Sequence, residues 1–277
     1  MNQLSRGGLL SLFRPKLAVV NGIAAGGGYL LFPFAQVSAP LWRVMAGVTL
    51  LAAAGSAANQ VLEQDLDRLM DRTKSRPLPQ GTITPATAVV MACALLVAGL
   101  LLLSPQGLLP MLLGGAALAW YLGVYTPLKR RSPFALLAGG ICGAMGPVIG
   151  WCGAGGSASD YRVILLAGLL YLWQIPHFWL FQHRHQDDYR LAGLPIFDPR
   201  TPGSSPTAFC RLWIIALMAG SFMLPLFGLI APGLLPWYST ALLFLGTLSL
   251  VGPQRSRLAA LNLFPLLVPL TLFIQGR

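Results

Sequence analysis

Residues 85–104 read PATAVVMACALLVAGLLLLS and contain no charged side chain. A transmembrane helix needs about 20 consecutive, mainly apolar residues, so this stretch is long enough to cross a bilayer. Eight further stretches of similar length and character lie on either side of it. We therefore expect an all-α membrane protein with nine transmembrane helices, over residues 17–37, 41–62, 85–104, 107–125, 134–152, 161–181, 207–230, 234–251 and 257–275.

The composition of the whole chain indicates the same fold class. Of 277 residues, 55% are apolar and 10% are charged, whereas a soluble domain carries about 25% charged residues. These charges are too few to cover a soluble enzyme or binding module, and the apolar content is too high for disorder. Because the nine stretches take up most of the chain, we expect one membrane domain over residues 1–277.

The basic residues predict how the helices are oriented. The net charge is +11, and all Lys and Arg except Arg43, Arg162 and Arg277 lie in the N-terminal arm and in alternate loops. Loops rich in Lys and Arg face the cytoplasm, so we expect a cytoplasmic N-terminus and an outer C-terminus in the cell (inner) membrane. The orientation of the helices in the lipid bilayer thus explains the net positive charge, and we expect no nucleic acid as a partner.

Seven of the eight acidic residues and all three histidines fall in two segments at the expected cytoplasmic face. Ionisable groups near a membrane core are costly and usually mark a functional site. In the first segment Asn59, Glu63, Asp67 and Asp71 are four residues apart, which places them along one face of a continuing helix. Carboxylates this close repel unless a cation holds them, and oxygen ligands favour Mg²⁺ or Ca²⁺ over zinc. We therefore expect a Mg²⁺ site along this face.

Basic residues follow the first acidic segment directly. Arg72, Lys74 and Arg76 can bind phosphate oxygens that the metal ion does not reach. Lys129 and Arg130, at the end of a later helix on the same face, could also reach a diphosphate. The alternative is a solvated helix end with ordinary cytoplasmic charges.

The second segment, residues 173–195, carries a histidine within an apolar stretch and two adjacent carboxylates. His177 is either a hydrogen-bonded buried histidine or a contact for an acceptor or a metallo-macrocycle. Asp187 and Asp188 form a second candidate Mg²⁺ site. Two such segments beside an apolar interior indicate ionisation of an allylic diphosphate, with a dry cavity that protects the cation.

Several runs of residues along the chain carry a family resemblance. They are Phe13-Arg14-Pro15-Lys16, residues 59–77, Tyr125-Thr126-Pro127-Leu128-Lys129-Arg130, the glycine-rich residues up to Gly150-Trp151, Trp173-Gln174-x-Pro176-His177-Phe178, and Asp188-Tyr189-x-x-Ala192-Gly193-x-Pro195. With these runs the chain resembles the intramembrane UbiA-type prenyltransferase superfamily and, within it, the family of protoheme IX farnesyltransferases, also called haem O synthases. The resemblance covers nearly the whole chain and implies a UbiA-type helix bundle.

The resemblance implies that a farnesyl group passes from farnesyl diphosphate to a vinyl group of haem B, with addition of water, to give haem O. Mg²⁺ is the implied cofactor, and haem A synthase or a terminal oxidase assembly is the implied partner. The implied catalytic residues are Asn59, Glu63, Asp67 and Asp188, all four of them metal ligands together with Asp187. The implied substrate-binding residues are Arg72, Lys74, Arg76, Tyr125, Lys129, Arg130, Trp173, His177 and Tyr189.

The departures from the family pattern are two single positions and two short runs, Ser132-Pro133-Phe134-Ala135 and Ile196-Phe197-Asp198. Glu63 stands where the family has Asp, and Gly146 stands where a second proline usually precedes Pro147. A quinone-precursor aromatic ring or another tetrapyrrole therefore remains open as acceptor. A function of a different class, an ion-coupled transporter or a haem carrier, is also open, although a transporter would be expected to place carboxylates near the midplane.

Overall fold

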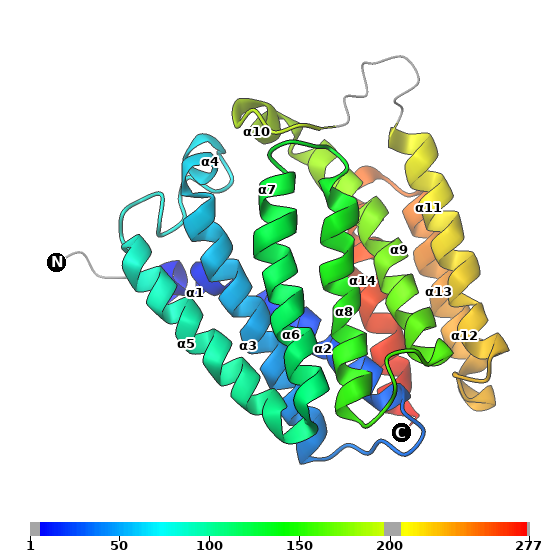
Figure 1. The fold of residues 1–277 in the computed structure, drawn as a ribbon. Coiled ribbons are helices and arrows are strands. Elements are labelled where there is room, and N and C mark those ends of the chain that lie inside the picture. The colour runs from blue at the N-terminus through cyan, green and yellow to red at the C-terminus, as the bar shows by residue number, and fades with distance from the viewer. Residues whose placement is uncertain (1–5, 197–205, 276–277) are drawn as a thin grey trace.

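The computed structural model describes residues 6–196 and 206–275, and Arg277 lies outside this range. All regular secondary structure in the described chain is helical, as Figure 1 shows. The helices are α1 (Arg6–Phe13), α2 (Pro15–Leu31), α3 (Ala39–Leu62), α4 (Gln64–Leu69), α5 (Pro85–Leu103), η1 (Ser104–Gln106), α6 (Leu108–Trp120), η2 (Tyr121–Tyr125), α7 (Thr126–Leu128), α8 (Ala135–Gly153), α9 (Tyr161–Arg184), α10 (Gln186–Leu191), α11 (Pro206–Ser221), α12 (Met223–Leu226), η3 (Pro232–Leu234), α13 (Leu235–Val251) and α14 (Gln254–Ile274).

Eight helical segments in the described chain are long and apolar enough to cross a membrane. They correspond to eight of the nine predicted stretches, and the chain is a multi-pass membrane protein. The remaining stretch, residues 17–37, contains α2, which has 17 residues and ends at Leu31. At 1.5 Å per residue α2 is about 26 Å long, slightly less than a bilayer core of about 30 Å. The count of nine therefore stays a prediction.

Within the bundle, the helices differ in how much of their surface is buried. The membrane-spanning windows of α3, α8 and α14 are more than half buried, whereas those of α5 and α6 are mostly exposed. The exposed side chains on these outer helices, such as Val90, Leu101 and Leu112, are apolar, as expected for a surface that faces lipid.

Two glycines bring α2 and α8 into close contact. A Cβ atom added to Gly28 would lie 2.0 Å from the carbonyl oxygen of Pro147, and one added to Gly150 would lie 1.8 Å from that of Ala25. Small residues of this kind let membrane helices approach closely. Because α2 also packs on α3 and α14, this contact joins the inner helices of the bundle.

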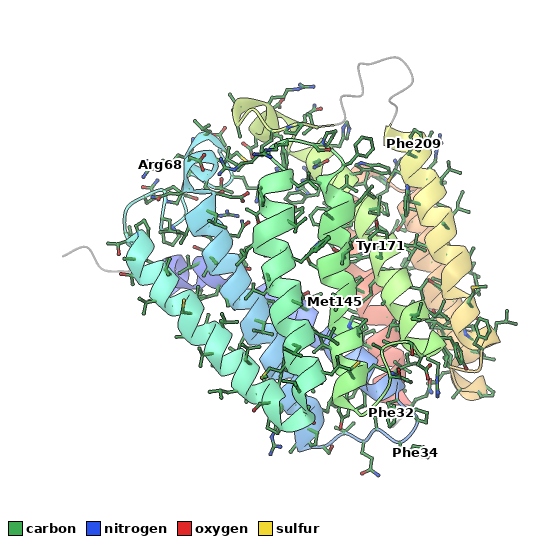
Figure 2. All side chains as sticks on the ribbon, viewed as in Figure 1. Phe32, Phe34, Arg68, Met145, Tyr171 and Phe209 are labelled. Atoms are coloured by element: carbon green, nitrogen blue, oxygen red, sulfur yellow. The ribbon has the colours of Figure 1, made fainter. Side chains whose placement is uncertain are left out.

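The two ends of the bundle differ in their residues. In Figure 1, α4 and α10 lie together at the upper end, while the C-terminus lies at the lower end. Figure 2 places Arg68 at the upper end and Phe32 and Phe34 at the lower end. Both predicted acidic segments thus reach the same end of the molecule.

Candidate active site

A cavity of about 300 Å³ extends into the bundle from the end that carries the acidic segments. Glu63 and Asp67 line its polar end, and Leu51, Leu118 and Ile149 line its apolar part. Along α3, Val48 and Glu63 are 15 residues apart and both line the cavity, which corresponds to about 22 Å of helix. The arrangement suits a substrate with an anionic head and a long apolar chain.

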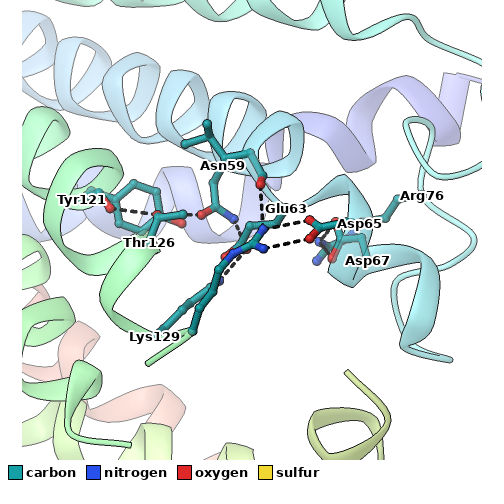
Figure 3. Close-up of polar contacts among 10 residues, drawn as sticks. Asn59, Glu63, Asp65, Asp67, Arg76, Tyr121, Thr126 and Lys129 are labelled. Atoms are coloured by element: carbon teal, nitrogen blue, oxygen red, sulfur yellow. Dashed lines mark hydrogen bonds and ion pairs between the residues drawn. The ribbon is translucent and has the colours of Figure 1, made fainter. Parts of the chain in front are cut away.

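Glu63 lies at the centre of a hydrogen-bond network between α3 and the end of α7 (Figure 3). The hydroxyl of Thr126 donates to Oδ1 of Asn59 at 2.9 Å, and Nδ2 of Asn59 donates to Oε2 of Glu63 at 2.7 Å. Nζ of Lys129 donates to the same oxygen of Glu63 at 2.5 Å. These contacts fix the orientation of the Asn59 amide and hold one oxygen of a carboxylate that is only 4% exposed.

Asp67 forms the second ion pair of the site. Arg76 donates to both of its carboxylate oxygens, at 2.9 and 2.7 Å, and Asp67 is 1% exposed. The hydroxyl of Thr73 donates to the backbone oxygen of Asp67, which folds the loop after α4 back towards the cavity. Both bonds come from the same nitrogen, Nη1 of Arg76, and bonds between two charged groups of this kind are stronger than neutral ones.

The helix that carries these residues is interrupted, unlike the continuous helix expected over residues 59–71. Helix α3 ends at Leu62, Glu63 has a φ of −120°, and α4 runs only to Leu69. Asn59, Glu63 and Asp67 still line the cavity. Asp71 lies beyond α4, where it is exposed and paired with Lys74, so its predicted place on the shared face is wrong.

The donor set at Glu63 fits a magnesium ion. Oε1 of Glu63 is buried without a hydrogen-bond partner in the described structure, and a buried unpaired carboxylate oxygen is costly. No group of three or more His, Cys, Asp or Glu side chains among the described residues is close enough to hold a metal. Mg²⁺ usually takes one or two carboxylates and completes its shell with water and phosphate oxygens. Glu63, Asp67 and the Asn59 oxygen match that mode of binding.

The cations at the polar end fit a phosphate group. The guanidinium of Arg72 lies 5.1 Å from the ring centroid of Phe181, and its Nε is buried without a partner among the described residues. Burial lowers the pKa of Arg72 and also that of Lys129, although Glu63 raises the latter. Buried cations of this kind are stabilised by an anion, and an arginine fork matches phosphate oxygens.

His177 lies on the wall of the cavity among aromatic rings. Its ring stacks on Trp173 with centroids 5.0 Å apart and planes 27° apart, and it contacts Phe178 edge-on. Nδ1 of His177 is buried without a hydrogen-bond partner in the described chain, so the structure does not supply a hydrogen bond for this atom. The indole N–H of Trp173 donates to the carbonyl of Leu261, which fixes the ring on which His177 stacks.

Of the residues that sequence analysis proposed, nine line the cavity. They are Asn59, Glu63, Asp67, Arg72, Arg76, Tyr125, Lys129, His177 and Tyr189. The other five do not line it. Lys74 pairs with Asp71, and Arg130 pairs with Asp65. The side chain of Asp187 is 87% exposed and lies 3.7 Å from Arg190, whereas Asp188 accepts a hydrogen bond from the backbone of Asp71. Trp173 does not line the cavity itself but stacks on His177, which does.

Thr126 and Tyr121 belong to the site although sequence analysis gave them no role. Thr126 donates to Asn59, and Tyr121 stacks on Tyr125 with ring centroids 5.6 Å apart. Residues Tyr121–Tyr125 form a π-helical turn, a feature that often occurs at functional sites. The spacing of four residues between Tyr121 and Tyr125 could have predicted that both side chains lie on the same helix face.

Comparison with known proteins gives the family of the chain. A family model described as the UbiA prenyltransferase family matches residues 20–260. The chain belongs to the UbiA prenyltransferase family. As a member of this family it is a prenyltransferase, and its resemblance to the protoheme IX farnesyltransferases is confirmed by two curated relatives.

The UbiA-family chain is 53% identical over 266 residues to the protoheme IX farnesyltransferase of Geobacter sulfurreducens, over 96% of this chain and 98% of that protein. It is 43% identical over 224 residues to the protoheme IX farnesyltransferase of Oleidesulfovibrio alaskensis, over 80% of this chain and 78% of that protein.

Two solved structures of UbiA homologues share the fold. The apo structure of a homologue from Aeropyrum pernix K1 superposes with a TM-score of 0.78 at 22% identity, over 95% of this chain and 98% of that one. A homologue from Archaeoglobus fulgidus bound to GPP and Mg²⁺ superposes with a TM-score of 0.70 at 17% identity, over 96% and 98%. The helix bundle is therefore a UbiA bundle.

Proposed function

We propose that this chain transfers a farnesyl group from farnesyl diphosphate to a vinyl group of haem B, with addition of water, to give haem O. The observation that carries the proposal is the buried oxygen pair at Glu63. One oxygen is held by Asn59 and Lys129, and the other is free for a metal ion at the polar end of an apolar cavity. The names of the relatives supply the acceptor and the prenyl donor.

The polar end binds the diphosphate in this proposal. A magnesium ion held by Asn59, Glu63 and Asp67 would supply the Lewis acid that stabilises the leaving diphosphate. Lys129 and Arg76 lie against these carboxylates, so each can shift its hydrogen bonds to phosphate oxygens when the metal ion neutralises its present partner. Such preorganised charges are the main means of stabilising a leaving diphosphate.

The apolar part of the cavity protects the allylic cation. Leu51, Leu118 and Ile149 line it, and their side chains offer no nucleophile. Excluding water there keeps the cation intact until the acceptor attacks. The paired rings of Tyr121 and Tyr125 also line the cavity, and the electron-rich face of an aromatic ring attracts a cation.

The acceptor lies on the α9 side of the cavity in this proposal. His177, backed by the ring of Trp173 and next to Phe178, forms a flat aromatic wall. A planar macrocycle would stack against such rings, and the unpaired Nδ1 of His177 would gain a polar partner. Tyr189 lines the cavity as well and would contact the bound substrates.

The membrane arrangement forms part of the same proposal. Residues 1–277 act as a single domain with nine spans, α2 being the first, in the cell (inner) membrane. The N-terminus and the active site face the cytoplasm and the C-terminus faces outward. This orientation follows because the basic loops lie at the same end of the bundle as the polar part of the cavity, and basic loops face the cytoplasm. Haem A synthase or a terminal oxidase would use the product.

Mass spectrometry of extracted haem tests the proposal. The purified full chain is incubated with haem B, farnesyl diphosphate and Mg²⁺, with a quinone-precursor ring offered in parallel. The proposal expects haem to gain one farnesyl group and one water. Transfer to the quinone precursor alone would keep the diphosphate site but assign another acceptor. No transfer to any acceptor, together with ion-coupled uptake, would favour the transporter.

A further inference from the structure

The charges at the polar end of the cavity do not balance. Within the described chain, the charged side chains lining the cavity are Arg14, Glu63, Asp67, Arg72, Arg76 and Lys129. Arg76 is paired with Asp67 and Lys129 with Glu63. The guanidinium of Arg14 makes no hydrogen bond or ion pair with any residue in the described ranges. Arg14 and Arg72 therefore leave an excess of positive charge at this end.

Arg14 also has an unusual backbone. It lies between α1 and α2 with φ 46° and ψ 60°, and it is the one residue other than glycine with a positive φ in residues 6–196 and 206–275. A left-handed conformation is unfavourable for a side chain as large as arginine. Such strain persists where the surrounding structure imposes it, often at functional sites. Pro15 then starts α2 with a fixed φ.

Gln60 of α3 holds the end of α1 just before Arg14. Its Nε2 donates to the carbonyl oxygen of Leu12 at 2.7 Å and to that of Ser11 at 3.3 Å, and Gln60 is only 1% exposed. These carbonyls belong to the last turn of α1, immediately before Arg14. Since Gln60 follows Asn59, one turn of α3 both supplies the metal-site amide and anchors α1.

Arg14 is close enough to affect the other cations. Burial lowers the pKa of Lys129, and the charge of Arg14 acts in the same direction. The pKa of Arg72 is also lowered by burial first, and by Arg14 among its charged neighbours. Because Arg14 and Arg72 have no carboxylate partner, an anion bound between the cations of the cavity would lower their mutual repulsion.

We propose that Arg14 is a further diphosphate-binding residue and that Gln60 is a positioning residue that holds Arg14 at the cavity through α1. This rests on the proposed function, because the anion is the diphosphate of the prenyl donor. Arg14 offers a fork of N–H groups to the phosphate oxygens that the metal ion, Arg76 and Lys129 leave free.

Binding of inorganic pyrophosphate with Mg²⁺ to the purified full chain tests the proposal without any acceptor. By calorimetry, Arg14→Gln should weaken binding about tenfold to a hundredfold, the range for a hydrogen bond to a charged group. Lys16→Gln is the matched control, because Lys16 is exposed, lies two residues away and carries the same charge. It should bind as the wild type does, and Arg14→Lys should recover part of the loss.

Steady-state kinetics separate binding from damage to the fold. Arg14→Gln should raise KM for farnesyl diphosphate and leave KM for the acceptor unchanged, and Gln60→Leu should do the same to a smaller extent. Equal binding by Arg14→Gln and wild type, or equal weakening by Lys16→Gln, would overturn the inference while leaving the diphosphate site in place. Failure of the wild type to bind pyrophosphate would overturn both proposals. If Gln60→Leu does not fold, Arg14→Gln still decides.

Discussion

The backbone N–H of Asp71 donates a 2.8 Å hydrogen bond to Oδ1 of Asp188, two residues that are 117 positions apart. The contact joins the two acidic segments above the cavity. Apolar contacts accompany it, since Met70 packs with Leu194 in a small buried cluster. The two segments thus form one layer over the polar end, and Asp188 holds that layer together in addition to its expected role at a second metal site.

Substitution of Asp188 separates these two roles. Asp188→Asn keeps an oxygen that accepts from the Asp71 amide, whereas Asp188→Ala leaves that amide without its partner. We expect both variants to lose turnover if Asp188 binds Mg²⁺, but only Asp188→Ala to lose about 1 kcal/mol of stability. Turnover and thermal unfolding in detergent measure the two effects. Full activity of Asp188→Asn would restrict this residue to its structural role.

Neutralising the carboxylates of the first site should abolish turnover. We expect Glu63→Gln and Asp67→Asn each to lower kcat by about 10²- to 10³-fold, the scale on which removing one stabilising group acts. Asp65→Asn is the control, because Asp65 lies between them in sequence but is 62% exposed, pairs with Arg130 and does not line the cavity. Wild-type activity in the Glu63 and Asp67 variants at limiting Mg²⁺ would refute the assignment.

Lys129 should set an alkaline limit to activity. Burial lowers its pKa, so its ammonium loses its proton at a lower pH than an ordinary lysine, whose pKa is about 10.4. As pH rises through the lowered pKa of Lys129, the positive charge opposite Glu63 disappears, and kcat/KM for the prenyl diphosphate should fall. Lys129→Arg keeps its charge and should remove this alkaline limb from the pH profile of kcat/KM. An unchanged limb in Lys129→Arg would assign it to another group.

The close contact of α2 and α8 should not tolerate a methyl group. Gly150→Ala places a Cβ on the carbonyl oxygen of Ala25, so we expect a loss of about 1–3 kcal/mol of stability, as for other overpacked sites. Gly168→Ala is the control, because a Cβ there meets nothing within 4 Å and the site lies in a helix, α9. Thermal unfolding in detergent compares the two variants, and equal midpoints would contradict the packing described.

Much of the fold could be predicted from the sequence because hydropathy marks membrane helices directly. Eight of the nine stretches correspond to helices long enough to span, and the two acidic segments meet at one end as predicted. Helix ends were less predictable. The break at Glu63 left Asp71 outside the site, because backbone conformation at a helix end depends on contacts such as the one from Asp71 to Asp188.

Pairings between distant residues could not be predicted from spacing. Lys129 and Glu63 are 66 positions apart, and only the packing of α3 against α6 and η2 brings them together. Lys74 and Arg130 were expected at the substrate, but Asp71 and Asp65 hold them outside the cavity. Arg14 was expected among the cytoplasmic charges and in a run that matches the family, but without a role at the site, since its place on the cavity wall depends on the turn between α1 and α2.

In the proposed reaction, ionisation of farnesyl diphosphate at Glu63 and Asp67 is coupled to transfer of the farnesyl group to haem B. The most direct measurement counts diphosphate released and haem product formed in one reaction of the full chain with haem B, farnesyl diphosphate and Mg²⁺. We expect one farnesylated, hydrated haem for each diphosphate, with both signals lost when Mg²⁺ is chelated. Release of diphosphate with unchanged haem, or haem conversion that persists after chelation, would contradict this expectation.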